Sequence, residues 1–161
     1  MTEIPISLAV NGRVHGLAVP PNTVLADLLR DRFALNGCKV GCDEGVCGAC
    51  TVLVDGIPTA ACATFAFAVD GCSVTTIEGL GRAGALDRVQ AAFLATGAFQ
   101  CGFCTPGMIL SIVALLVREP DPNDEMIRDW LGGNLCRCTG YRQIVDAIRH
   151  ASLAQSAVPV P

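Results

Sequence analysis

Apolar and polar residues alternate along residues 4–20, and the alternation is interrupted once, at Asn11-Gly12. This dipeptide is typical of a type I′ turn, whose two central residues both need a positive φ. Alternation with a period of two places the apolar side chains on one face of a strand. The pattern therefore predicts a β-hairpin formed by Ile4–Val10 and Arg13–Val19.

A second hairpin is predicted around Asp55-Gly56, a dipeptide that favours the same kind of turn. Its strands would be Thr51–Val54 and residues 58–62. The β-rich run at residues 73–77 would add a last strand. The first half of the chain is therefore expected to form a small mixed sheet.

One helix is predicted between the two hairpins, with a cap at Asn22 or Thr23 and an end near Phe33. Its apolar residues recur at helical spacing and share one face. They are Val24, Leu25, Leu28 and Leu29. This helix would cross the sheet and cover one of its faces.

Helical spacing begins after the glycine-rich segment 79–84 and continues almost to the C-terminus. Thr105-Pro106 combines a capping hydroxyl with proline at the first helical position, and Thr139 can cap a last helix. The predicted helices are residues 86–95, 106–118, 124–131 and 140–154. We therefore expect an α+β protein with a sheet domain at residues 1–80, a helical domain at 81–155 and a flexible tail at 156–161.

Composition excludes several classes of function. The chain has 161 residues, a net charge of −4 and scattered basic residues, which give no electrostatic footprint for nucleic acid. The longest apolar run, residues 108–117, is about half as long as a membrane span. Only 16% of residues are charged and 52% are apolar, which indicates surface buried against partner chains. The N-terminus resembles no signal peptide, so we expect a cytoplasmic protein whose ten cysteines stay reduced or bind metal.

Four cysteines follow the spacing of plant-type 2Fe-2S ferredoxins, in which a distant fourth ligand joins three clustered ones. An anionic cluster needs a loop whose amides turn toward the sulfurs, and Gly41, Gly45 and Gly48 permit the positive φ that such a loop requires. A structural zinc site also takes four cysteines, but the four-residue gap and the glycines argue against it. The candidate ligands are Cys42, Cys47, Cys50 and Cys62.

A second set of four consists of Cys101-Gly-Phe-Cys104 and Cys136-Arg-Cys138. Its spacing alone also suits zinc. Cys104 and Cys138 each directly precede a predicted helix start, and the partial positive charge of a helix N-terminus favours an anionic cluster. Arg137 and Arg142 could balance further cluster charge. We therefore predict a second 2Fe-2S cluster here.

The other candidate groups have simpler interpretations. Cys38 and Cys72 are interpreted as buried small residues, because both ligand sets are complete without them. His15 and His150 have no paired nucleophile or carboxylate in the sequence, and we expect both at the surface. The segment 79–84 imitates a dinucleotide-binding fingerprint but lacks a full βαβ unit, so it is interpreted as a linker. The residues thus predict an electron carrier without a substrate site of its own.

Three motifs together resemble one known family. The sequences GCDEGVCGACTVLVDG at residues 41–56, QCGFCTPGMILS at 100–111 and GNLCRCTGY at 133–141 are similar to the signatures of the iron-sulfur subunit of molybdenum hydroxylases, the xanthine oxidase family. Their order and spacing also match, and the resemblance covers about residues 4–152. Family members often have threonine where Cys38 stands.

The resemblance implies a fold and a direction of electron flow. It implies an N-terminal β-grasp domain of plant-ferredoxin type and a C-terminal four-helix bundle, each holding one 2Fe-2S cluster. Electrons would run from a molybdopterin cofactor in a large partner subunit through the helical-domain cluster and then the sheet-domain cluster to FAD in a medium subunit. The chain would be a non-catalytic subunit of an oxidoreductase, assembled as a dimer of heterotrimers.

The resemblance also assigns roles to two residues. The position matching Cys138 would contact the pterin while ligating iron, and the position matching Gln100 would also reach the cofactor. The substrate would bind in the large subunit. Similar small subunits serve enzymes of carbon monoxide, purines, aldehydes and N-heterocycles, among which we favour an N-heterocycle.

Two other functions remain open from the residues alone. A free-standing two-cluster ferredoxin would usually be strongly acidic and rich in charge to steer its encounters, and this chain is neither. A zinc-stabilised interaction module would be colourless, whereas two clusters predict about four irons and four sulfides per chain.

Overall fold

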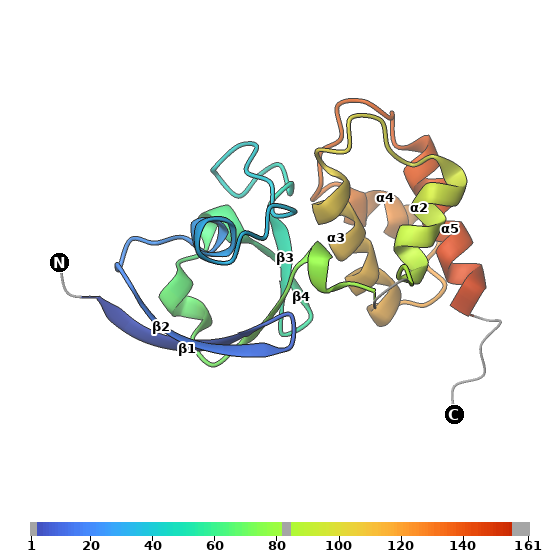
Figure 1. The fold of residues 1–161 in the computed structure, drawn as a ribbon. Coiled ribbons are helices and arrows are strands. Elements are labelled where there is room, and N and C mark those ends of the chain that lie inside the picture. The colour runs from blue at the N-terminus through green and yellow to red at the C-terminus, as the bar shows by residue number, and fades with distance from the viewer. Residues whose placement is uncertain (1–2, 82–84, 156–161) are drawn as a thin grey trace.

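The computed structural model describes residues 3–81 and 85–155, which form two units (Figure 1). The sheet unit contains the five strands of the first half of the chain, and the helical unit contains the helices that follow residue 85. This arrangement confirms the predicted α+β class, in which a mixed sheet is followed by helices. The predicted flexible tail, 156–161, and residues 82–84 of the predicted linker lie outside the described residues.

The sheet has the strand order β2-β1-β5-β3-β4. Both hairpins are confirmed, and Asn11 and Gly12 have φ values of 49° and 80°, as a type I′ turn requires. The short strand β5 runs parallel to β1 and antiparallel to β3, and so joins the two hairpins into one sheet. The strands are β1 (Ile4–Val10), β2 (Arg13–Val19), β3 (Thr51–Val54), β4 (Ile57–Ala60) and β5 (Ser73–Thr75).

The ends of β4 and β5 differ from the prediction. Strand β4 begins at Ile57 and ends at Ala60, after which Ala61–Ala63 form a 3-10 turn. This turn places Cys62 in the core, where 5% of its surface is exposed. Strand β5 ends at Thr75, because Ile77–Gly79 form another 3-10 turn that leads out of the sheet.

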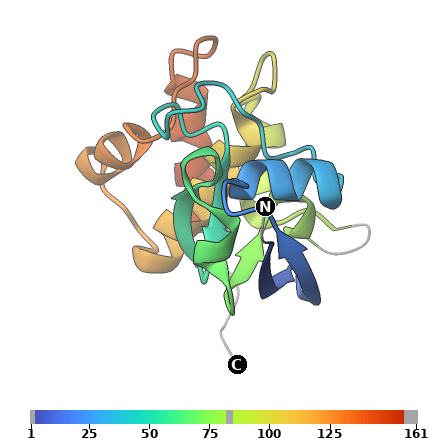
Figure 2. The ribbon, with the colours of Figure 1, turned by 90° about the vertical axis from the view of Figure 1, so that its left-hand side faces the viewer.

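A short helical segment lies over the sheet (Figure 2). Helix α1 (Leu25–Asp27) continues directly into a π-helical turn (Leu28–Arg32), and its apolar residues are buried in the sheet core as the pattern predicted. The predicted cap is wrong, because Val24 is the N-cap residue and no side chain caps the helix. Instead, the Leu25 N–H donates to the carbonyl of Thr64, so tertiary contacts hold this end.

The helical unit packs four helices around one apolar core. Asp87 and Gln90 form a capping box for the first helix, and Asn123 caps the third by accepting from the Met126 N–H at 3.0 Å. The helices are α2 (Arg88–Thr96), α3 (Thr105–Arg118), α4 (Asp124–Leu131) and α5 (Arg142–Gln155). Their largest buried side chains are Phe93, Met108, Leu110, Ile112, Leu115, Leu116, Ile127 and Ile144.

Three helix starts differ from the prediction. Helix α2 begins at Arg88 rather than at residue 86, since the cap is Asp87. Helix α3 has Cys104 as its N-cap residue, which places Pro106 one position further into the helix than predicted. Helix α5 begins at Arg142, and Thr139 does not cap it because its hydroxyl is bonded elsewhere, to Tyr141 and Cys136.

The two units meet along α3, which packs against β3. Leu53, Leu110 and Ala114 form a small apolar cluster at this contact. None of the helices within the described residues is long and apolar enough to cross a membrane. The contact brings the loops that carry both cysteine sets to the same side of the molecule, the upper side in Figure 1.

Candidate iron-sulfur sites

The four candidate ligand cysteines of the sheet unit lie on one loop, residues 41–50, and on the turn that follows β4. They are linked in two pairs: the Cys47 N–H donates to the Cys42 sulfur at 3.4 Å, and the Cys62 N–H donates to the Cys50 sulfur at 3.5 Å. The pairs come together because the hairpin of β3 and β4 returns the chain to the loop. Cys62 thereby comes to lie beside the loop, where its sulfur accepts a hydrogen bond from the Gly45 N–H.

Backbone amides point at the sulfurs of this loop. The N–H groups of Glu44 and Cys47 both donate to the Cys42 sulfur at 3.4 Å, and the Gly45 N–H donates to the Cys62 sulfur at 3.4 Å. These amides lower the pKa of Cys42 to about 6, whereas burial raises the pKa of Cys62 to about 11. The loop therefore stabilises negative charge at its solvent side and shields the opposite side from water.

The loop requires glycine for two different structural reasons. Gly45 and Gly48 have φ values of +72° and +69°, as predicted. Gly41 does not, and there the prediction is wrong. A Cβ at Gly41 would lie 3.2 Å from the Cys47 sulfur and 3.3 Å from a ring carbon of Phe103, so Gly41 provides space rather than an unusual conformation.

The second set lies on two loops of the helical unit, one before α3 and one before α5. Its sulfurs are also paired. The sulfurs of Cys101 and Cys138 lie 3.5 Å apart and are exposed, whereas Cys104 and Cys136 are partly buried and close enough to interact electrostatically. Burial raises the pKa of Cys104 to about 12. One side of this site therefore faces solvent, and the other faces the helical core.

Two side chains around this site, those of Tyr141 and Thr139, were not singled out from the sequence as binding groups. The Tyr141 hydroxyl accepts from the Cys136 N–H at 2.8 Å and donates to the Asn134 carbonyl at 3.0 Å. Burial raises the pKa of Cys136, but hydrogen bonds from the Thr139 hydroxyl and from nearby amides lower it below its usual value overall. The spacing of cysteines carries no signal for these contacts, because they arise only when the loop is folded.

The sulfur pairing fits a dinuclear cluster. Among residues 3–81 and 85–155, no group of three or more Cys, His, Asp or Glu side chains gathers around one point as the ligands of a single ion would. Each iron of a 2Fe-2S cluster takes two protein ligands, so four cysteines in two pairs can hold one such cluster. The pairing at both sites therefore suits two 2Fe-2S clusters.

The two sites are joined by a main-chain hydrogen bond. The Leu135 N–H donates to the Cys47 carbonyl at 2.8 Å. Leu135 is covalently bonded to Cys136 in the second site, and Cys47 belongs to the first. Phe103 adds a second contact, since its ring lies against Gly41 beside the Cys47 sulfur. The candidate ligand sets are thus connected without any intervening element.

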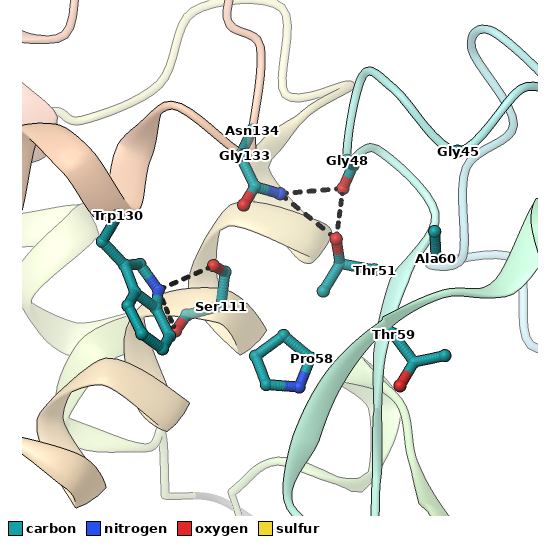
Figure 3. Close-up of a pocket in the computed structure, with 10 residues that line it drawn as sticks. All are labelled: Gly45, Gly48, Thr51, Pro58, Thr59, Ala60, Ser111, Trp130, Gly133 and Asn134. Carbon is teal, nitrogen blue, oxygen red and sulfur yellow. Dashed lines mark hydrogen bonds between the residues drawn. The ribbon is translucent and has the colours of Figure 1, made fainter.

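A groove of about 330 Å³ runs along the boundary of the two units (Figure 3). On one wall, the Trp130 indole N–H donates to the carbonyl and the hydroxyl of Ser111. At its end, the Asn134 side chain points across the boundary to Gly48 and Thr51, as Figure 3 shows. This groove lies beside the candidate ligand loops and contains none of the eight cysteines.

The remaining candidate residues belong to neither ligand set, although Cys38 lies beside Cys50. Cys38 is buried, its thiol donates to the Cys50 carbonyl at 3.6 Å, and burial raises its pKa to about 12. Cys72 lies on the far turn beside Asp70 and is only partly buried, so the expectation of a buried residue is correct for Cys38 and wrong for Cys72. The ring of His15 packs on Phe33 with 4.6 Å between ring centroids, which leaves it half-buried rather than fully at the surface.

His150 is exposed on α5, and Gln100 is exposed on the loop directly before Cys101. Arg137 and Arg142, which could balance cluster charge, are exposed too. The N-terminus of α3 lies at the second site as predicted, since Cys104 is its N-cap residue. The N-terminus of α5 does not directly follow Cys138, because that helix begins four residues later than the cysteine.

Comparison with known proteins identifies both halves of the chain. Residues 8–68 match the model of the 2Fe-2S iron-sulfur cluster binding domain, and residues 76–149 match that of a second 2Fe-2S binding domain. The nicotinate dehydrogenase small FeS subunit of Eubacterium barkeri is 48% identical over 94% of this chain and 96% of its own length. The nicotine 6-hydroxylase small subunit of Paenarthrobacter nicotinovorans is 47% identical over 92% of this chain and 90% of its own.

The fold agrees with these relatives. The crystal structure of quinoline 2-oxidoreductase from Pseudomonas putida 86 contains a chain that superposes with a TM-score of 0.92 at 41% identity, and the match covers 99% of this chain and 100% of that one. Both cluster-binding halves and nearly the whole length are therefore shared. The chain belongs to the family of small 2Fe-2S subunits of molybdenum hydroxylases.

Proposed function

We propose that this chain relays electrons from a molybdopterin centre in a large partner subunit to FAD in a medium one. Its own part is to hold two 2Fe-2S clusters in series. One is held by Cys42, Cys47, Cys50 and Cys62 in a β-grasp domain at residues 1–80, and the other by Cys101, Cys104, Cys136 and Cys138 in a four-helix bundle at residues 81–155. A 2Fe-2S cluster supplies one-electron chemistry when bound.

The observation that carries the proposal is the hydrogen bond from the Leu135 N–H to the Cys47 carbonyl. It links a residue bonded to one ligand of the helical site with a ligand of the sheet site. Electron transfer between two centres is favoured by short, connected routes, and this route crosses the boundary of the two units through a single hydrogen bond of 2.8 Å.

Exposed apolar side chains support the assignment of the partner on the helical side. Phe99, Phe103 and Leu135 flank the helical site, and between 39% and 57% of each is exposed. Large apolar side chains at the surface indicate protein interfaces. We propose that the molybdopterin subunit covers them, and that Cys138 and Gln100, both exposed there, contact the pterin.

A second group of apolar residues flanks the sheet site. Val46 and Phe65 are 63% and 48% exposed, and they lie next to Cys47 and three residues after Cys62. We propose that the flavin subunit docks on this side. The exposed apolar residues beside the two sites argue against a free-standing ferredoxin, because such a carrier would leave both apolar surfaces in water.

The names of the relatives support an N-heterocyclic substrate for the complete enzyme. Relatives of this chain are subunits of enzymes named for nicotinate, nicotine and caffeine, and the superposed structure is named for quinoline. Relatives at 43–45% identity are named as aldehyde oxidoreductases, so an aldehyde is the second candidate class. The substrate itself would bind outside this chain.

Native purification tests the proposal. A tag on this chain should recover two larger subunits with molybdenum and flavin, in a complex whose mass corresponds to a dimer of heterotrimers. The chain itself should contain about four irons and four sulfides. Recovery of the chain alone, with its clusters intact and no molybdenum- or flavin-bearing partner, would favour the free-standing ferredoxin instead.

A further inference from the structure

The sulfur of Cys136 receives a hydrogen bond from a side-chain hydroxyl. Thr139 Oγ1 lies 3.1 Å from Cys136 Sγ, three residues away along the loop. Both residues are partly buried, so bulk water does not freely replace this contact. In the sheet site, the sulfurs of Cys42, Cys50 and Cys62 accept hydrogen bonds from backbone N–H groups instead.

The hydrogen-bond partners of Thr139 determine where its hydroxyl proton points. The Tyr141 N–H donates to Thr139 Oγ1 at 3.1 Å, so the hydroxyl oxygen already serves as an acceptor. Its single proton is then available for the Cys136 sulfur. The loop maintains this geometry at a conformational cost, since Tyr141, which is not a glycine, has a positive φ of 67°. Tyr141 also fixes Cys136 itself, through the bond from the Cys136 N–H to its hydroxyl at 2.8 Å.

A donor to a ligand sulfur affects the two oxidation states of a cluster differently. Reduction adds one electron to the cluster and makes its ligand sulfurs more negative, so the hydrogen bond becomes stronger in the reduced state. The proton remains on the Thr139 oxygen in both states, and no bond to it is broken. The reduced form is therefore stabilised, and the reduction potential rises.

We propose that Thr139 sets the reduction potential of the cluster held by Cys101, Cys104, Cys136 and Cys138, by donating its hydroxyl proton to the Cys136 sulfur. Within the described part of the chain, Thr139 supplies the one hydroxyl group that donates to a ligand sulfur. The inference rests on the proposed ligand set, and it deepens the proposed relay because this potential sets the driving force for both electron steps.

The test is a redox titration of the purified complex, followed by EPR, of Thr139→Val and Thr139→Ser beside the unaltered protein. Valine keeps the volume and removes the hydroxyl, and serine retains it. Loss of a hydrogen bond of ordinary strength in Thr139→Val should disfavour reduction of the helical-domain cluster by roughly three- to tenfold. This corresponds to a reduction potential lowered by about 30–60 mV, at 59 mV per tenfold change. Thr139→Ser should leave it near its original value.

The sheet-domain cluster is the internal control, since its potential should stay constant in every variant. An unchanged helical-cluster potential in Thr139→Val, or an equal shift of both clusters, would overturn the proposal. If Thr139→Val lost the cluster, Thr139→Ala should show the same lowered potential. Loss of the cluster in both, with retention in Thr139→Ser, would assign the hydroxyl to cluster assembly and reject the tuning role. The titration gives this answer whether or not larger subunits copurify, so it is separable from the test of the relay.

Discussion

The side-chain amide of Asn134 donates to the carbonyl oxygen of Gly48 at 2.9 Å, across 86 residues of sequence. It also donates to the Thr51 hydroxyl at 3.2 Å, and 4% of Asn134 is exposed. Gly48 directly follows Cys47, and Asn134 directly precedes Leu135. The carboxamide therefore fixes the position of the main-chain bond that joins the two candidate cluster sites.

Asn134→Asp should weaken the contact between the units. The carboxylate would place an acceptor oxygen against the Gly48 carbonyl, and loss of a buried donor of this kind costs about 1–3 kcal/mol. We expect the visible absorbance of the clusters to bleach at a lower temperature. Asn36→Asp makes the same chemical change at an exposed site and should leave that temperature unaltered. Equal bleaching temperatures for the two variants would contradict the assigned role.

Gly107→Ala should separate the same two surfaces. A Cβ at Gly107 would overlap the Gly48 carbonyl oxygen, and backbone on both sides leaves no flexible side chain to move away. Overpacking of this kind costs about 1–3 kcal/mol. Gly16→Ala is the matched control, because a Cβ there meets nothing within 4 Å. Thermal melting of both variants checks the prediction, and a Gly107→Ala protein as stable as Gly16→Ala would refute it.

Single ligand substitutions should separate the two clusters spectroscopically. Cys47→Ser should remove one EPR signal of the reduced protein, and Cys104→Ser should remove the other, because each cysteine belongs to a different set. Cys72→Ser should retain both signals, since Cys72 lies on a turn beside Asp70. A substitution that removed both signals or neither would show that the ligand sets are wrongly divided.

Asp124 should stabilise the helical unit, and this stabilisation should be lost in acid. The hydrogen bond and charge of Arg149, 2.6 Å away, hold the pKa of this carboxyl below its usual value. A lowered folded-state pKa means that the stabilisation is present above the usual carboxyl pKa and is lost as the pH falls through the lowered one. Asp124→Asn should therefore flatten the acid limb of the curve of melting temperature against pH. Asp129→Asn, which removes the same charge from the same helix, should not.

The sequence predicted the hairpins to the residue at their turns, because Asn11-Gly12 and Asp55-Gly56 allow few other conformations. The apolar faces of the helices were equally clear. Helix starts were less predictable, since a hydroxyl or amide near a terminus has several potential partners. Thr139 illustrates this, because its hydroxyl bonds to Tyr141 and Cys136 and the helix begins later.

The cysteine spacing predicted the two ligand sets, which the structure brings together as paired sulfurs. It carried no information about the contact between them. Asn134 and Gly107 act on the Gly48 carbonyl, and these partners are 86 and 59 positions apart in the chain. Such contacts depend on how the two units pack against each other, which no local pattern encodes.

The bond between Leu135 and Cys47 consists only of main-chain groups, and every amino acid except proline carries the N–H that it needs. Replacement of the Leu135 side chain can therefore change which surface meets a neighbouring subunit without deleting the bond. A subunit built in this way can accumulate surface substitutions, and can be adapted to new partner enzymes, while the internal connection is inherited unchanged.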